Sequence, residues 1–269
     1  MHQKTTFPMK KLYLLPLLLL LILSCGIGPK HEQAAENEEW IQLFNGKDLE
    51  GWTIKMAKHQ IDENFNNTFR VENGLMVTRY DQYEKFDGEY GHIFYNTPFS
   101  HYKLRVEYRV VGEQVTGGAG WAMKNSGVMF HAQSPQSMLL NQDFPVCIEA
   151  QFLGGLGEGE RPTGNLCTPS THVVMNGELL TRHCTNSTSP TFHGEEWVTF
   201  ELEVRGDSII HHLINGDTVL TYSKPQVGGG SPEGYPIPEG TPITSGYIAL
   251  QAESHPYEFR KVELLDLSK

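Results

Sequence analysis

The chain has 269 residues and a formal net charge of −11 at pH 7. This charge argues against nucleic acid and anionic membrane surfaces as partners, because their phosphates would repel the protein. It does not disfavour a neutral ligand such as a sugar, and the length allows one large domain.

The first 24 residues have the organisation of a secretory signal. Lys10 and Lys11 precede the apolar run LYLLPLLLLLILS, and Cys25 follows this run directly. A basic end, a short apolar core and a small residue before the cleavage site define such signals. The ending ILSC looks like the lipobox of bacterial lipoproteins, whereas a transmembrane helix, the alternative, would need a longer run. We therefore predict a signal over 1–24, lipidation of Cys25, and export to the bacterial cell envelope with the lipid as the only membrane contact.

The next segment, 25–39, is polar and acidic. It cannot bury enough apolar surface to fold, so we expect a tether. Beyond it, short segments of alternating polar and apolar residues dominate, with turn signals such as Asn73-Gly74 and Asn215-Gly216. Many short strands with frequent turns are typical of sandwiches and barrels. We expect residues 40–269 to form one all-β domain, a jelly-roll β-sandwich of two large antiparallel sheets, one of them concave.

Four of the expected strands carry large polar residues on one side and apolar residues on the other. Their polar side chains include Arg105, Glu107, Arg109, Glu149, Gln151, Gln251, Glu253, Glu258 and Arg260. Each segment alone fits a solvated strand face, which is the commoner arrangement. Together they favour a second interpretation, in which these side chains share one concave sheet face and bind a ligand there.

The segment NSGVMFHA, residues 125–132, strengthens the second interpretation. Gly127 lies inside it, and glycine within a strand often marks the close approach of a ligand or of backbone. Strict alternation would place Phe130 on one face and Met129 with His131 on the other. His131 is therefore a candidate site residue, although an isolated histidine is more often structural.

Three cysteines remain beyond the expected lipidation site: Cys147, Cys167 and Cys184. An exported protein can keep disulfides, and three cysteines permit three single pairings. Cys167 and Cys184 flank a turn-rich segment, so we expect this pair, with a stabilisation of roughly 3 kcal/mol in the chain-entropy model. Cys147 is then a buried free thiol. A zinc site is the alternative, but the cysteines lack C-x-x-C spacing.

Six blocks of the sequence resemble one protein family in their order along the chain. They are WIQLFNGKDLEGW, GHIFYNTPFSHYKLRVEYR, NSGVMFHA, CIEAQF, HHLINGDTV and GYIALQAESHPYEFRKVEL. Over residues 39–267 the chain resembles the 3-keto-disaccharide hydrolase domain family. The resemblance implies a concanavalin A-like jelly roll and a hydrolase that cleaves glycosides whose sugar carries a ketone at C3.

The chemistry that this resemblance implies begins at C2, whose proton the neighbouring ketone acidifies. The enolate expels the C1 substituent by β-elimination, and water then adds. Such a reaction needs a base, an acid, and a donor or cation for the enolate oxygen. Glu149 is the candidate base, and His131 is the candidate acid or second base, because histidine titrates near neutral pH. The candidates for binding the substrate are Asn125, Gln151, Glu107, Arg109, Glu253 and Arg260, and of these Arg109 or Arg260 is the candidate for stabilising the enolate.

Two further possibilities stay open. Glu107 and Glu253 are candidate ligands for a divalent cation, although no compact ligand motif is visible. The chain could also be a non-catalytic, lectin-like binding protein with Trp121, Tyr90 and Tyr95 stacking on sugar rings. An enzyme needs a carboxylate or histidine with a shifted pKa in a pocket, whereas a lectin needs only hydrogen-bonding groups on an open face.

Overall fold

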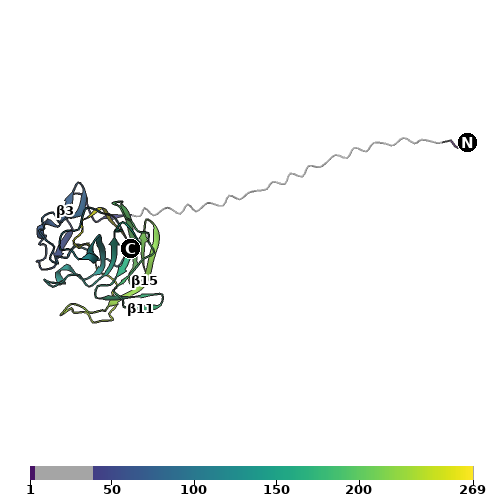
Figure 1. The fold of residues 1–269 in the computed structure, drawn as a ribbon. Coiled ribbons are helices and arrows are strands. Elements are labelled where there is room, and N and C mark those ends of the chain that lie inside the picture. Colours follow the sequence, from purple (N-terminus) through teal and green to yellow (C-terminus); the bar gives the residue numbers. More distant parts are fainter. Residues whose placement is uncertain (4–38, 269) are drawn as a thin grey trace. The chain divides into compact units, whose positions relative to one another are not determined.

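A computed structural model of the chain describes residues 1–3 and 39–268 (Figure 1). Cys25 and nearly all of the predicted signal and tether lie outside these residues. Within the part of the chain that the structure describes, no helix has the length and apolar character needed to span a membrane. Residues 39–268 are all-β apart from three single turns of 3-10 helix, which confirms the predicted fold class.

The larger of two antiparallel sheets has ten strands, and labels β11 and β3 mark its edges in Figure 1. Its order is β11 (Glu178–Leu180), β10 (Thr171–Met175), β15 (Asp217–Val227), β14 (Ile210–Ile214), β13 (Val198–Arg205), β6 (His101–Val110), β17 (Tyr257–Asp266), β4 (Leu75–Thr78) and β3 (Phe69–Glu72). The short strand β1 (Ile41–Gln42) pairs with β17 beside this order.

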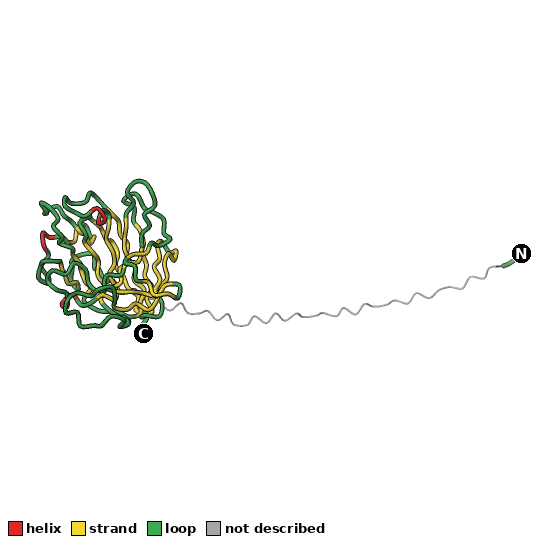
Figure 2. Tube along the Cα trace, turned by 60° about the horizontal axis from the view of Figure 1, so that its bottom comes forward, coloured by secondary structure: helices red, strands yellow, loops and turns green. Residues whose placement is uncertain are grey.

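The smaller sheet has seven strands. Its order is β12 (Cys184–Thr185), β9 (Asn165–Cys167), β8 (Ile148–Leu153), β7 (Asn125–Ala132), β16 (Tyr247–Ala252), β5 (Gly91–Tyr95) and β2 (Trp52–Met56). The helical turns are η1 (Phe65–Asn67), η2 (Gly120–Ala122) and η3 (Pro135–Ser137). Figure 2 shows the strands grouped in the middle of the domain, with loops around their ends. The two sheets form the expected jelly-roll sandwich.

The core between the sheets comes from one side of each strand. Along β6, buried residues alternate with half-buried ones, so Leu104, Val106 and Tyr108 point inward. Phe152 of β8 meets them from the smaller sheet, and its ring stacks on that of Tyr108 with 4.0 Å between centroids. The period of two follows from strand geometry and leaves the alternate side chains for the outer faces.

Two of the predicted hairpin turns are confirmed. Asn73 and Gly74, with φ of 52° and 80°, join β3 to β4. Asn215 and Gly216, with φ of 50° and 90°, join β14 to β15. Asparagine and glycine tolerate these left-handed conformations, which tight hairpin turns require at both central positions.

A second, smaller apolar cluster lies on the outer face of the seven-stranded sheet. Its buried members are Phe94, Met129, Ala132, Met138, Cys147 and Ala249. The segment 133–147 covers this part of the sheet, and Phe144 packs against the cluster from it. Cys147 is a buried free thiol, as predicted, with its Sγ 3.6 Å from the Met129 Sδ. It has the same strand parity as Glu149, but a loop covers it.

A buried lysine attaches this covering segment to the edge of the sheet. The Lys55 Nζ donates hydrogen bonds to the carbonyl oxygens of Met56, His59 and Leu140, at 2.7, 3.1 and 3.2 Å. Three carbonyl acceptors satisfy the ammonium group, which would otherwise be costly to bury. The part of the outer face that segment 133–147 leaves uncovered carries a cavity.

Candidate active site

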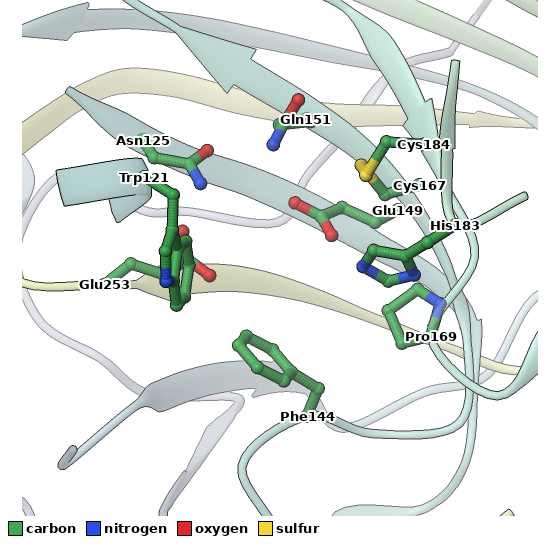
Figure 3. Close-up of a pocket in the computed structure, with 10 residues that line it drawn as sticks. All are labelled: Trp121, Asn125, Phe144, Glu149, Gln151, Cys167, Pro169, His183, Cys184 and Glu253. Atoms are coloured by element: carbon green, nitrogen blue, oxygen red, sulfur yellow. A yellow bond between two sulfur atoms is a disulfide. The ribbon is translucent and has the colours of Figure 1, made fainter. Parts of the chain in front are cut away.

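A cavity of about 350 Å³ opens on the outer face of the seven-stranded sheet. Figure 3 shows the ten residues that line it, which are Trp121, Asn125, Phe144, Glu149, Gln151, Cys167, Pro169, His183, Cys184 and Glu253. Its size is typical of a pocket for a small molecule such as a sugar.

Strand register builds the floor of the cavity. Glu149 and Gln151 alternate with core residues along β8, so both point away from the core. Glu149 pairs with Cys167 of β9 and with Met129 of β7, while Gln151 pairs with Gly127 of β7. Directly opposed residues share a sheet face. The prediction that Glu149 and Gln151 lie on one outer sheet face is therefore confirmed.

Gly127 makes room for the Glu149 carboxylate. A Cβ at position 127 would lie 3.0 Å from Glu149 Oε1 and 2.9 Å from the Ala150 carbonyl oxygen. Both distances are shorter than ordinary carbon–oxygen contacts. The close approach predicted at Gly127 is therefore present. The groups that approach it are the Ala150 carbonyl and the carboxylate of Glu149, the candidate base.

Replacing Gly127 with alanine is expected to lower kcat by about ten-fold or more, because the methyl group displaces the Glu149 carboxylate. Steady-state kinetics on a 3-keto-glucoside would measure the change. Gly120→Ala is the matched control, since a Cβ there meets no atom within 4 Å. An unchanged kcat in the Gly127 variant would show that the carboxylate position is unimportant.

Two buried carboxyl groups share the cavity. Glu149 is 5% exposed and Glu253 is 2% exposed, and Glu253 Oε2 has no hydrogen-bond partner among the described residues. Burial raises the pKa of Glu149 to about 8. Burial and the Glu149 charge raise the pKa of Glu253 well above its usual range. Two carboxylates in one poorly solvated site resist double ionisation, so the pair retains a proton near neutral pH.

Buried polar atoms without partners are concentrated on this face. Among the described residues, Asn125 Oδ1, both ring nitrogens of His92 and both amide atoms of Gln251 lack hydrogen bonds. His92 is directly opposite Gln251 in the sheet, and the Phe144 ring covers His92 with 5.9 Å between centroids. More than nine-tenths of buried polar groups in proteins are paired. Of these residues Asn125 lines the cavity, so its unpaired Oδ1 can accept a hydrogen bond from a polar ligand there.

Aromatic rings form one side of the cavity. Trp121 of η2 is 56% exposed and stacks on Tyr90, with 5.8 Å between ring centroids. Tyr90 also contacts Phe144 at 5.2 Å. Of the three aromatic residues predicted to stack on sugars, Trp121 lines the cavity and Tyr90 supports it. Tyr95 packs edge-on against Trp52 instead.

Three residues predicted to bind substrate lie in the other sheet. Glu107 and Arg109 belong to β6 and Arg260 to β17, both in the ten-stranded sheet. Glu107 forms an ion pair with Arg260, and Arg109 Nη2 lies 2.6 Å from a Glu258 carboxylate oxygen. Both guanidinium groups lie over the Trp197 ring. The prediction that all four polar segments share one face is wrong, because alternation identifies a side of a strand and not its sheet.

The candidate cation ligands are separated for the same reason. Glu107 lies on β6 of the larger sheet, whereas Glu253 lines the cavity of the smaller one. The two carboxylates cannot hold one ion together. Over residues 39–268, no group of three or more histidine, cysteine, aspartate or glutamate side chains is arranged to hold a metal ion.

His131 points away from the cavity. Its φ is 48°, and the pairing of β7 with β16 shifts register between Tyr247 and Ala249. The irregularity breaks the alternation, so Met129 faces outward while His131 Nε2 donates to the Gly206 carbonyl oxygen at 3.1 Å. Burial lowers the pKa of His131 to about 4. The prediction that His131 shares the face of Glu149 is wrong.

Sequence reasoning missed the histidine that does line the cavity, His183. It directly precedes Cys184, whose predicted disulfide with Cys167 is present. The pairing of β12 with β9, and of β9 with β8, brings it to the cavity. Its adjacency to a disulfide cysteine was the available signal, but the sequence alone does not show which strand that cysteine joins.

Fold and site together define a carbohydrate-active protein of the jelly-roll class. The family model of the 3-keto-alpha-glucoside-1,2-lyase-like domain matches residues 39–265, and the chain belongs to this family. The family resemblance seen in the sequence is thereby confirmed.

Two solved structures from Parabacteroides distasonis ATCC 8503, both described provisionally as glycosyl hydrolases, have a similar fold. The first is 20% identical to this chain, with a TM-score of 0.51. The similarity covers 86% of this chain and 95% of the other. The second is 17% identical to this chain, with a TM-score of 0.50. The similarity covers 85% of this chain and 100% of the other. At these identities the similarity concerns the fold alone. No curated protein matches the chain.

Proposed function

We propose that the protein cleaves 3-keto-glycosides by abstraction of the C2 proton, β-elimination and hydration. The observation that carries the proposal is the buried pair of Glu149 and Glu253, whose pKa values are both raised. A base with a pKa near the working pH is well suited to removing a weakly acidic proton. Membership in the lyase-like family supports the same chemistry.

In the proposed first step, the Glu149 carboxylate takes the C2 proton. The C–H electron pair becomes a C2=C3 bond, and the ketone oxygen becomes an enolate. In the second step the enolate returns to the ketone and a C1=C2 bond forms. The electron pair of the C1–O bond leaves with the departing oxygen, which gains a proton. Water then adds its oxygen to C1, and Glu149 returns a proton to C2. The sum is one water consumed and a 3-keto sugar and an alcohol released.

The neighbouring side chains have complementary roles in this proposal. Glu253 keeps its proton near neutral pH and donates it as a hydrogen bond to the enolate oxygen, as carboxylic acids in apolar sites can. The amides of Asn125 and Gln151 bind sugar hydroxyls, and Trp121 stacks on the sugar ring. Arg109 and Arg260, expected from sequence to stabilise the enolate, have no part because they lie in the other sheet.

The test is incubation of the purified protein with a 3-keto-glucoside and with the same glucoside unoxidised. Cleavage of the keto substrate alone is expected, because only a ketone at C3 acidifies the C2 proton. Cleavage of both at similar rates would instead indicate ordinary glycoside hydrolysis, which does not break the C2–H bond.

A lectin-like function is the second candidate, which the exposed Trp121 favours. It predicts similar affinities for oxidised and unoxidised sugars and no turnover of either. Isothermal titration with both ligands, together with product analysis, separates the two functions. The buried, unpaired Glu253 favours the enzyme, because a lectin gains nothing from a carboxyl group that is costly to bury.

We also propose export with a lipid on Cys25. The signal-like sequence and the disulfide between Cys167 and Cys184 support it, since disulfides persist in oxidising compartments. Labelling of cells with radioactive palmitate should mark the wild-type protein and leave Cys25→Ser unlabelled. Equal labelling of both would contradict lipidation at this cysteine.

A further inference from the structure

The disulfide between Cys167 and Cys184 lies in the cavity wall beside the candidate base. Cys167 of β9 pairs with Glu149 of β8, and Cys184 of β12 pairs with Cys167. Both cysteines line the cavity (Figure 3). β12 has only two residues, and so short an edge strand has few ladder hydrogen bonds to hold it. The disulfide is the covalent link between this edge and β9, beside hydrogen bonds such as that from the Ser187 N–H to Asn165 Oδ1 at 2.9 Å.

Hydrogen bonds from Thr168 hold the backbone of His183 next to the disulfide. The His183 carbonyl oxygen accepts hydrogen bonds from the Thr168 backbone N–H at 2.9 Å and from its hydroxyl at 3.2 Å. Thr168 follows Cys167 and His183 precedes Cys184, so these bonds lie next to the disulfide. No described residue hydrogen-bonds to the His183 imidazole, which lines the same cavity as Glu149 (Figure 3). Its ring nitrogens are available to a ligand.

His183 lies at the boundary between two cavities. A second cavity of about 320 Å³ shares Phe144, Pro169 and His183 with the first. Glu149 and Glu253 line only the first, so a reacting sugar belongs there. A substituent on C1 that extends into the second cavity passes His183. In such a pose the imidazole lies on the aglycone side of the reacting sugar, because His183 lines both cavities.

We propose that His183 donates the proton to the leaving oxygen, and that the Cys167–Cys184 disulfide positions it to do so. This inference rests on the proposed cleavage of 3-keto-glycosides. The imidazolium gives its proton to the oxygen as the C1–O bond breaks. The neutral imidazole then takes a proton from the water that adds to C1, which restores the starting state. Among the described residues that line the first cavity, His183 is the one histidine, and histidine performs both transfers near neutral pH.

The variant His183→Gln, assayed on two 3-keto-glucosides, tests the role of the imidazole. With a methyl group as aglycone, kcat is expected to fall about 10²-fold, because methoxide needs a proton to leave. With a 4-nitrophenyl aglycone, the loss is expected to stay within about three-fold, because nitrophenolate leaves unprotonated. His211→Gln, on β14 of the other sheet, is the control. Equal losses on both substrates, or no loss on either, would overturn the proposal.

Removal of the disulfide tests its positioning role. The double variant Cys167→Ser/Cys184→Ser should show the same dependence on the leaving group, with a loss of about ten-fold on the methyl glycoside. In the His183→Gln background, removing the disulfide should cause no further loss in kcat. Equal losses in both backgrounds, or on both substrates, would show a purely structural disulfide.

Two controls keep these outcomes separate from other failures. If the double variant does not fold, mild reduction of the wild-type protein below its unfolding temperature gives the same comparison. If the wild-type protein cleaves neither substrate, the proposed function itself fails. Turnover by the wild type with no leaving-group effect in either variant overturns only the role of His183.

Discussion

Replacing Glu149 with glutamine is expected to lower kcat on a 3-keto-glucoside by about 10³-fold, with KM changed by no more than a few-fold. The amide keeps the shape of the side chain and its hydrogen-bonding capacity, but it cannot accept the C2 proton. Steady-state kinetics across a pH range would measure the effect. In the wild type, kcat/KM on a 4-nitrophenyl 3-keto-glucoside, whose leaving group needs no proton, should rise with pH toward about 8, because only the ionised carboxylate acts as a base.

The control for this variant is Glu203→Gln, on β13 of the ten-stranded sheet. The Glu203 carboxylate forms a partly exposed ion pair with Arg205, and exposed pairs contribute little to stability. Its turnover should match that of the wild type. If Glu149→Gln retained activity within ten-fold of the wild type, the assignment of the base would be wrong.

The Glu149→Gln variant is expected to be more stable than the wild type at alkaline pH. The pKa of Glu149 is raised from 4.5 to about 8 by burial. Between these values the folded protein holds a proton that the unfolded chain has released, so the free energy of unfolding falls as pH rises. Above about pH 8 the wild type must bury an ionised carboxylate, whereas the glutamine variant buries a neutral amide.

The expected difference in Tm grows from near zero at pH 4.5 to about 10–20 °C at pH 9, because a pKa raised from 4.5 to about 8 corresponds to a difference on the order of 5 kcal/mol. Thermal unfolding of both proteins at several pH values measures it. A difference in Tm that does not change with pH, or a variant less stable than the wild type at pH 9, would contradict the burial of an ionisable Glu149. Loss of activity together with a gain in stability is common at functional sites.

Much of the fold is predictable because its signals are local. The inward side chains of β6, such as Leu104 and Val106, follow from a period of two. The Asn73-Gly74 turn follows from the left-handed backbone that such hairpins require. The same period of two predicts the outward side chains of Glu149 and Gln151, because their strand has core residues on its other side.

The remaining site residues depend on pairings between distant segments. Alternation placed Arg109 and Glu149 on polar sides of their strands, but only the sheet order shows that these sides face in opposite directions. The backbone irregularity at His131, whose φ is 48°, turns its side chain inward. No residue type in NSGVMFHA predicts this irregularity. His183 reaches the cavity through two successive strand pairings and a disulfide. None of these relationships is visible in a local pattern.

The most direct test of the central claim is a competition between a 3-keto-glucoside and the same compound deuterated at C2. If Glu149 removes the C2 proton in the committed step, the protiated substrate is consumed several-fold faster than the deuterated one. Equal rates of cleavage would contradict removal of the C2 proton in the committed step, as an ordinary glycosidic cleavage leaves the C2–H bond intact.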